Sequence, residues 1–126
     1  MVGFVIVSHS AKMAEGVADL ARMMAKTVPI AAAGGLEDGS FGTSFEKISN
    51  AIDQVYSDDG VIVLMDMGSA VMTAEMVIES MEGRKIVMAD CPIAEGAVTG
   101  TVNAEAGMSL EEILEDLEQV GTQKKL

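Results

Sequence analysis

The sequence has few of the residues from which metal sites, disulfides and anion-binding surfaces are usually built. It contains one histidine, one cysteine and no tryptophan, and 8 basic residues stand against 20 acidic ones. One histidine and one cysteine are too few for the ligand sets of common zinc sites. The lone Cys91, expected to be a small buried apolar residue, cannot form an intramolecular disulfide. This is typical of a reducing compartment, so we expect a cytoplasmic protein.

The formal net charge of −12 argues against two classes of partner. Nucleic-acid binding requires Lys and Arg to neutralise phosphates, and an anionic membrane surface would repel this chain. No apolar run approaches the roughly 20 residues that span a bilayer. The first apolar run has no basic stretch ahead of it, so we do not expect a signal peptide. The charge favours a protein partner that presents a basic face.

The sequence also lacks the motifs of several enzyme classes. Neither G-x-x-x-x-G-K-[ST] nor G-x-G-x-x-G occurs, so neither a P-loop nucleotidase nor a dinucleotide-binding enzyme is supported. A Ser-His-Asp hydrolase that uses Ser8, Ser10 or Ser69 remains formally possible, although the G-x-S-x-G motif of one such class is absent.

Apolar runs typical of buried strands alternate with helical patterns along the chain. We expect one domain over residues 1–126, because this length is enough for a substantial core. Periodicity predicts strands at 2–7, 29–35, 61–68 and 84–90, and helices at 10–26, 43–55, 69–82, 91–107 and 109–120.

Local signals refine some of these helices. Thr43 and Ser109 each precede a glutamate by three positions, which is the spacing of a capping box at a helix start. The helix at 91–107 is expected to be interrupted, because Gly96 and Gly100 weaken a helix interior.

The alternation of strands and helices predicts an α/β fold built from right-handed βαβ units. We expect a three-layer sandwich in which a small parallel sheet, of strand order 2-1-3-4, has helices on both faces. Strands 1 and 3 would then lie side by side at the topological switch point. Ligands of such sheets bind in the crevice beyond the carboxyl ends of those strands.

His9, the only histidine, follows the first strand, and Asp66 falls near the end of the third. In the predicted order, both side chains face the same crevice. A carboxylate bound to one imidazole nitrogen fixes the tautomer and leaves the other nitrogen as a more basic nucleophile. His9 is therefore the candidate catalytic nucleophile, and Asp66 is the residue expected to orient its ring.

Glycines and small hydroxyl residues gather at the same predicted edge. Helix N-termini with free backbone N–H groups are ready-made anion sites, so a nucleophilic histidine beside them suggests a phosphoryl group carried on His9. The residues predicted to bind phosphate or a partner are Ser10, Gly35, Gly39, Thr43, Ser44, Gly68 and Ser69.

Each of these residues also has a structural explanation. His9 could be a packed structural residue, Asp66 could cap the following helix, and the glycines could be ordinary turn residues. Thr43 and Ser69 are expected to cap helices whatever else they do. Most methionines should fill the core, although exposed ones within residues 65–72 would form an adaptable contact patch.

Four stretches resemble a known family: VIVSHSAKMAEGVADLARMM, GGLEDGSFGTSFEKI, VLMDMGSAVMTAEM and DCPIAEGAVTG. The chain is similar over nearly its whole length to the phosphotransferase subunits of phosphoenolpyruvate-dependent dihydroxyacetone kinase. These share the fold of mannose-class enzyme IIA domains of the sugar phosphotransferase system. A strand-end histidine is common to both groups. The D-x-G-S-A and P-x-x-E-G-A stretches favour the kinase branch, because sugar transporters are expected to have Gly-Gly-Ser-Pro after the aspartate.

The resemblance implies a concrete role. His9 would accept a phosphoryl group from the carrier protein HPr and pass it to ADP on the nucleotide-binding subunit of the kinase. The regenerated ATP would phosphorylate dihydroxyacetone. The resemblance also implies a homodimer, and no metal or cofactor of its own. The helix at 69–82 is one possible dimer interface, although it could equally be buried within the monomer.

Two other functions remain open at this point. A mannose-class enzyme IIA component of a sugar transporter would pass its phosphate to a IIB domain. A non-catalytic regulatory or interaction domain could keep the fold without the chemistry. Phosphorylation of His9 and delivery of phosphate to dihydroxyacetone would distinguish these possibilities.

Overall fold

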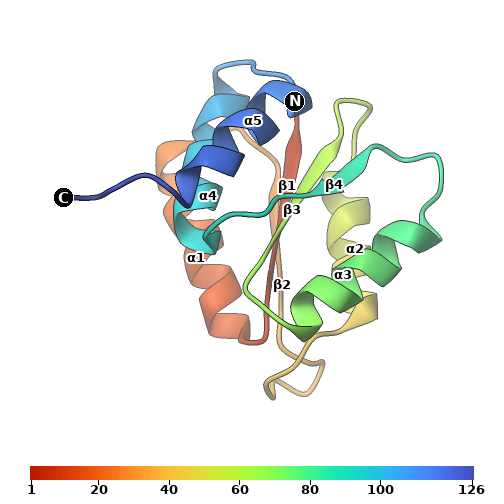
Figure 1. Ribbon diagram of the computed structural model, residues 1–126. Coiled ribbons are helices and arrows are strands. Elements are labelled where there is room, and N and C mark those ends of the chain that lie inside the picture. The colour runs from red at the N-terminus through yellow and green to blue at the C-terminus, as the bar shows by residue number, and fades with distance from the viewer.

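A four-stranded parallel sheet lies between two layers of helices in the computed structural model, which describes all residues 1–126 (Figure 1). The sheet order is β2-β1-β3-β4, so the predicted fold class and strand order are confirmed. The strands are β1 (Gly3–Ser8), β2 (Ile30–Gly34), β3 (Val61–Met65) and β4 (Ile86–Met88).

The two helical layers follow from the alternation of side chains along the central strand β1. Phe4 and Ile6 belong to one buried cluster and Val5 and Val7 to the other, because successive strand residues point to opposite faces. One face is covered by α1 (Ala11–Met24), α4 (Ile93–Glu105) and α5 (Leu110–Val120), and the other by α2 (Phe45–Val55) and α3 (Ser69–Ser80).

The register of the sheet decides where the strand ends meet. Val7 of β1 pairs with Met65 of β3, and the Asp66 N–H donates to the Val7 carbonyl at 3.1 Å. The residues that follow the two strands, His9 and Asp66, are thereby placed at the same edge of the sheet.

The predicted N-cap of α2 is wrong by one residue. Ser44, rather than Thr43, is the N-cap, and its hydroxyl accepts from the Lys47 N–H at 3.1 Å. The third helical residue is therefore Lys47 instead of Glu46, so no capping box forms. The capping box predicted at Ser109 is present at the start of α5.

The predicted interruption of α4 is also wrong, since the helix runs unbroken from Ile93 to Glu105. Its glycines are sites of close packing. A Cβ on Gly100 would lie 2.8 Å from the Phe4 ring, and one on Gly96 would lie 2.4 Å from Cys91 Sγ. The helix approaches the sheet closely because these positions carry no side chain.

The remaining differences are small. β4 is shorter than predicted and ends at Met88. Cys91 is half-buried rather than fully buried, and packs against the cluster that contains Phe4. None of the helices has the combination of length and hydrophobicity that crossing a membrane requires.

Candidate functional site

His9 lies in the short turn between β1 and α1. The residue before it, Ser8, is fully buried, and the residue after it, Ser10, is the N-cap of α1. The Ser10 hydroxyl accepts from the Met13 N–H at 3.2 Å, and the Ser10 N–H donates to Ser8 Oγ at 3.0 Å. Hydrogen bonds therefore hold the backbone on both sides of the histidine.

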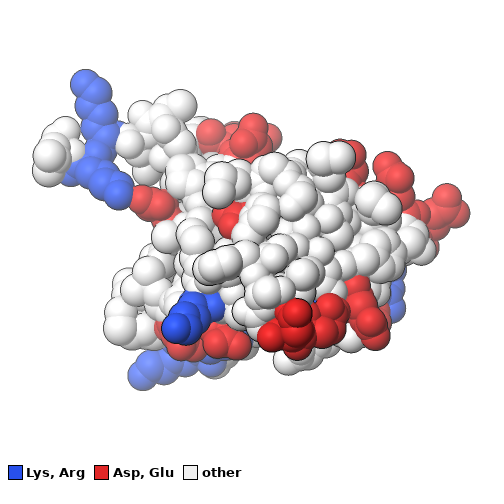
Figure 2. Space-filling view, turned by 90° about the horizontal axis from the view of Figure 1, so that it is seen from below, with Lys and Arg blue, Asp and Glu red and all other residues white.

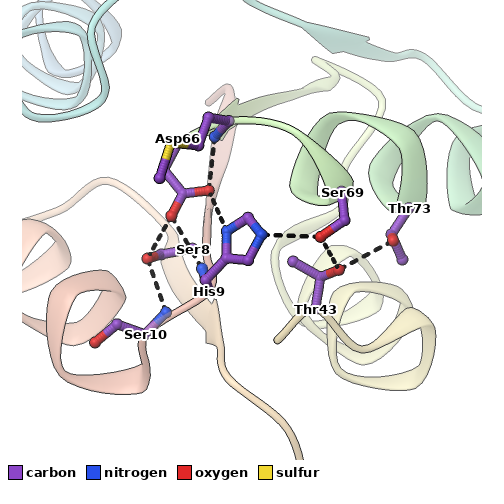
Figure 3. Close-up of polar contacts among 8 residues, drawn as sticks. Ser8, His9, Ser10, Thr43, Asp66, Ser69 and Thr73 are labelled. Atoms are coloured by element: carbon purple, nitrogen blue, oxygen red, sulfur yellow. Dashed lines mark hydrogen bonds and ion pairs between the residues drawn. The ribbon is translucent and has the colours of Figure 1, made fainter. Parts of the chain in front are cut away.

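Asp66 accepts four hydrogen bonds, two on each carboxylate oxygen (Figure 3). Oδ2 accepts from the Ser8 hydroxyl at 2.9 Å and from the His9 N–H at 3.0 Å. Oδ1 accepts from the Met67 N–H at 2.7 Å and lies 3.0 Å from His9 Nδ1. The carboxylate thus binds both the backbone and the ring of His9.

These contacts keep Asp66 ionised. Partial burial alone would raise the pKa of its carboxyl group. The backbone N–H groups of His9 and Met67, together with the Ser8 hydroxyl and the imidazole, outweigh that effect and lower the pKa below its ordinary value. An ionised Asp66 can only accept hydrogen bonds, so the proton in its contact with the ring belongs to His9 Nδ1.

The other ring nitrogen of His9 faces α3. Nε2 lies 2.9 Å from the Ser69 hydroxyl oxygen, and the His9 side chain is 32% exposed, compared with 10% for Asp66. With the proton on Nδ1, Nε2 carries a lone pair. The arrangement thus presents a partly exposed nitrogen nucleophile at the edge of the sheet, backed by a carboxylate.

Thr43 and Thr73 extend this set of contacts beyond Ser69. Thr43 Oγ1 donates to Ser69 Oγ at 3.1 Å and lies 3.1 Å from Thr73 Oγ1. Figure 3 shows Thr43 between the other two hydroxyls. Thr73 is absent from the residues expected from the sequence. Its position one helical turn after Ser69 was the available signal, because residues i and i+4 share a helix face.

The first turn of α3 has no side-chain cap. Its N-cap is Gly68, at φ +55°, and the Gly68 N–H makes no hydrogen bond. The expectation that Ser69 caps this helix is wrong, because Ser69 is its first helical residue and its hydroxyl lies beside His9. The alternative that Asp66 caps α3 also fails, since its oxygens are bonded elsewhere.

The segment from Gly35 to Ser44 lies beside the histidine. The Gly35 N–H donates to the Ser8 carbonyl at 3.1 Å, and the Gly42 N–H donates to the His9 carbonyl at 2.9 Å. Gly35 adopts φ +68°, a conformation that side-chain-bearing residues rarely adopt. Two backbone hydrogen bonds therefore attach this segment to Ser8 and His9.

Three residues predicted to bind phosphate or a partner make structural hydrogen bonds instead of contacting the ring. Ser10 and Ser44 cap helices, and Ser44 also donates to Glu37. The Gly39 N–H closes a turn on the Leu36 carbonyl at 3.0 Å. Any part these residues play in binding remains a prediction. No group of three or more His, Cys, Asp or Glu residues is placed to hold a metal ion.

A family model described as the fructose IIA component of the phosphotransferase system matches residues 3–114. The chain is 40% identical to the phosphotransferase subunit of the dihydroxyacetone kinase of Lactococcus lactis, over 97% of this chain and 98% of that one. It is 38% identical to the phosphoryl donor subunit of the kinase of Escherichia coli, over 92% of this chain. The chain spans only 26% of that longer relative.

Solved structures share the fold. A protein of unknown function matches with a TM-score of 0.88 and 28% identity, over 99% of this chain and 98% of that one. The mannose/sorbose-specific IIA subunit of Enterococcus faecalis matches with a TM-score of 0.59 and 16% identity, over 98% and 93%. The chain therefore belongs to the mannose-class enzyme IIA family, in the branch of the phosphoryl donor subunits of dihydroxyacetone kinase.

Proposed function

We propose that this chain is a phosphohistidine relay of phosphoenolpyruvate-dependent dihydroxyacetone kinase. His9 accepts a phosphoryl group from the phosphohistidine of HPr and passes it to ADP held on the nucleotide-binding subunit. The regenerated ATP then phosphorylates dihydroxyacetone. The observation that carries the proposal is the contact of Asp66 with His9 Nδ1, which leaves Nε2 as the nucleophile.

In the first step, Nε2 attacks the phosphorus of the donor. A bond from Nε2 to phosphorus forms as the bond from phosphorus to the donor nitrogen breaks, and the leaving imidazole keeps that electron pair. The His9 ring then bears phosphorus on Nε2 and a proton on Nδ1, so it carries a positive charge. Asp66, 3.0 Å from Nδ1, offsets this charge.

In the second step, a β-phosphate oxygen of ADP attacks the same phosphorus. The bond between Nε2 and phosphorus breaks, and its electron pair returns to the ring as the Nε2 lone pair. The proton on Nδ1 stays in place throughout, because Asp66 remains its acceptor. Both steps depend mainly on positioning and charge stabilisation, which suits a site of fixed hydrogen bonds.

Two neutral donors at the start of α3 could hold the transferred phosphoryl group. The Ser69 hydroxyl lies 2.9 Å from Nε2. The Gly68 N–H, which makes no other hydrogen bond, lies at the start of α3, where the helix dipole favours an anion. These donors are neutral, so they would hold the phosphoryl group without the strong attraction that would slow its departure.

The face around His9 has features expected of a docking surface. Figure 2 views the molecule from the end where β1 and β3 finish, and acidic side chains lie mainly around its margin. Phe41, in the segment that donates to the His9 carbonyl, is 80% exposed, and Met67, next to Asp66 in the chain, is 67% exposed. Apolar groups within an acidic margin favour partners with a complementary apolar patch and a basic rim. Phe41 was not among the residues that could be singled out from the sequence.

The partners of this proposal are HPr and the nucleotide-binding subunit, and the compartment is the cytoplasm. A homodimer is also proposed. Met72 and Met76 are exposed on α3, so the outer surface of this helix is available for a contact between two copies.

Reconstitution tests the function. Phosphoenolpyruvate, enzyme I and HPr should phosphorylate the chain, and addition of the ADP-loaded nucleotide-binding subunit with the dihydroxyacetone-binding subunit should yield dihydroxyacetone phosphate. A sugar-transporter component would instead pass its phosphate only to a IIB domain. A phosphorylated chain that transfers to IIB and leaves the ADP-loaded subunit unchanged would contradict the proposal.

The geometry also favours a second candidate function. Asp66, His9 and Ser69 are arranged as in a Ser-His-Asp triad, with the base 2.9 Å from the hydroxyl and 3.0 Å from the carboxylate. A fluorophosphonate probe distinguishes the two functions. A hydrolase would be labelled on Ser69, whereas a phosphohistidine relay would stay unlabelled under conditions that modify a control serine hydrolase.

A further inference from the structure

We propose that Thr43 and Thr73 are positioning residues of the phosphoryl-transfer site. Their hydroxyls form a chain that fixes Ser69 as a hydrogen-bond donor, first to the Nε2 lone pair of His9 and then to the phosphoryl group that Nε2 receives. The second half of this inference rests on the proposed function, whereas the first half concerns the unphosphorylated protein alone.

The direction of the chain follows from counting protons. Thr43 donates its single hydroxyl proton to Ser69 at 3.1 Å, so the proton of Ser69 is free to point at Nε2, 2.9 Å away. Because its only hydroxyl proton is used in the hydrogen bond to Ser69, Thr43 can only accept in its 3.1 Å contact with Thr73. The donors therefore run in one order, from Thr73 to Thr43, then to Ser69 and to His9.

Neither threonine makes the local hydrogen bond that its position usually offers. Thr43 stands at the start of α2, but Ser44 caps that helix. Thr73 lies inside α3, where a threonine hydroxyl commonly donates to the carbonyl four residues earlier. Thr101 of α4 makes that bond, at 2.7 Å to Ala97, and Thr73 does not. Both site hydroxyls are thus available to the chain.

The chain also joins two elements that surround the histidine. Thr43 belongs to the segment whose Gly42 N–H donates to the His9 carbonyl, while Ser69 and Thr73 lie one turn apart on α3. Both threonines are half-buried, which limits competition from water. A chain of hydroxyls that donate in the same direction strengthens each member, so the hydrogen bond donated by Ser69 is strengthened as well.

Phosphorylation changes what Nε2 can offer Ser69. Once its lone pair is bonded to phosphorus, Nε2 no longer accepts a hydrogen bond. Ser69 still accepts the hydrogen bond from Thr43, so its own hydroxyl must donate to another acceptor. The phosphoryl oxygens carried on Nε2 are acceptors only and lie within reach of the same hydroxyl. No proton is transferred in this exchange, since the Ser69 hydrogen bond moves from nitrogen to oxygen.

The variants Thr43→Val and Thr73→Val test the chain, because valine keeps the shape of threonine and removes the hydroxyl. Thr43→Ser, which restores a hydroxyl, is the rescue variant. Thr101→Val, which removes a threonine hydroxyl from α4, is the matched control. The first readout is the ¹⁵N chemical shift of Nε2 in the unphosphorylated protein. The second is the rate of phosphoryl transfer from phospho-HPr.

We expect both valine variants to move the Nε2 resonance and slow transfer roughly 2- to 10-fold, the range of one neutral hydrogen bond. Thr43→Ser should recover most of both, and Thr101→Val should change neither. Folded valine variants with the wild-type resonance and rate would overturn the inference. If the wild-type protein accepts no phosphoryl group, the proposed function fails, and the Nε2 resonance alone then decides whether the hydroxyl chain exists.

Discussion

Asp66 Oδ1 lies 3.0 Å from His9 Nδ1, although the two residues are 57 positions apart in the sequence. The pairing of Val7 with Met65 places the ends of β1 and β3 side by side and thereby creates this contact. A carboxylate and an imidazole in this relationship make one ring nitrogen a donor and leave the other as a nucleophile. The following predictions test this site and the packing that supports it.

Replacing Asp66 with asparagine should slow phosphoryl transfer without unfolding the protein. The amide removes the charge that offsets the phosphorylated ring, and its NH₂ group takes the place of one oxygen and cannot accept the two hydrogen bonds that this oxygen receives. Hydrogen bonds to charged groups contribute about 1.5–3 kcal/mol, so transfer should fall roughly 10- to 100-fold. Quenched-flow measurement of the transfer and circular dichroism of the fold check this.

The control for this variant is Asp58→Asn, because Asp58 is exposed and lies before β3, away from His9. It should transfer at the wild-type rate. If Asp66→Asn transferred equally fast, Asp66 would have no part in orienting the imidazole.

The stability of the protein should fall when the pH drops through the acid range. The pKa of Asp66 is lower in the folded protein than in the unfolded chain, so its contribution is fully present above the unfolded value of about 3.9. That contribution is lost as the pH falls through the lower, folded pKa. Urea unfolding at several pH values should show wild type losing its advantage over Asp66→Asn on acidification. A constant difference down to strongly acid pH would contradict the assignment.

Two glycines in helices should respond oppositely to replacement by alanine. Gly100→Ala places a methyl group 2.8 Å from the Phe4 ring, and such overpacking costs about 1–3 kcal/mol. Gly16 of α1 has no atom within 4 Å of an added Cβ, so Gly16→Ala should stabilise by about 0.5–1 kcal/mol through helix propensity. Denaturant unfolding measures both. A Gly100→Ala protein more stable than wild type would show that α4 does not pack closely on Phe4.

The thiol of Cys91 should react slowly with alkylating reagents. Burial, helped by the negative charge of Asp90, raises its pKa to about 11. At pH 8 a thiol with that pKa is about one part in a thousand thiolate, compared with roughly a quarter for an unperturbed cysteine. Iodoacetamide should therefore label the native protein at least tenfold more slowly than the urea-unfolded chain, because the higher nucleophilicity of a high-pKa thiolate offsets only part of its lower population. Equal rates would contradict this environment.

The parts of the structure that follow from hydrophobic periodicity could be predicted from the sequence. Buried apolar runs and helical patterns define the strands and helices, and the strand order expected for that alternation brings His9 to Asp66. This pairing depends on strand ends alone, so it tolerates errors of a residue or two in the predicted boundaries.

Features that depend on one atom of one side chain could not be predicted in the same way. Thr43 and Ser44 are adjacent, and both residue types are good helix caps. Only the three-dimensional course of the chain decides that Ser44 caps α2 and that Thr43 donates to Ser69. In the sequence, Gly100 resembles a residue that weakens a helix. Its actual role is to make room for the ring of Phe4, and this could not be predicted because Phe4 lies on a strand far away in the sequence.

The central claim is that His9 carries the phosphoryl group, and direct phosphorylation tests it. The chain is incubated with phosphoenolpyruvate, enzyme I and HPr, and the modified residue is located by mass spectrometry at neutral or alkaline pH, where phosphohistidine survives. We predict one phosphoryl group, attached to His9 at Nε2, and no labelling of His9→Ala. Phosphate on another residue, or undiminished labelling of His9→Ala, would contradict the account.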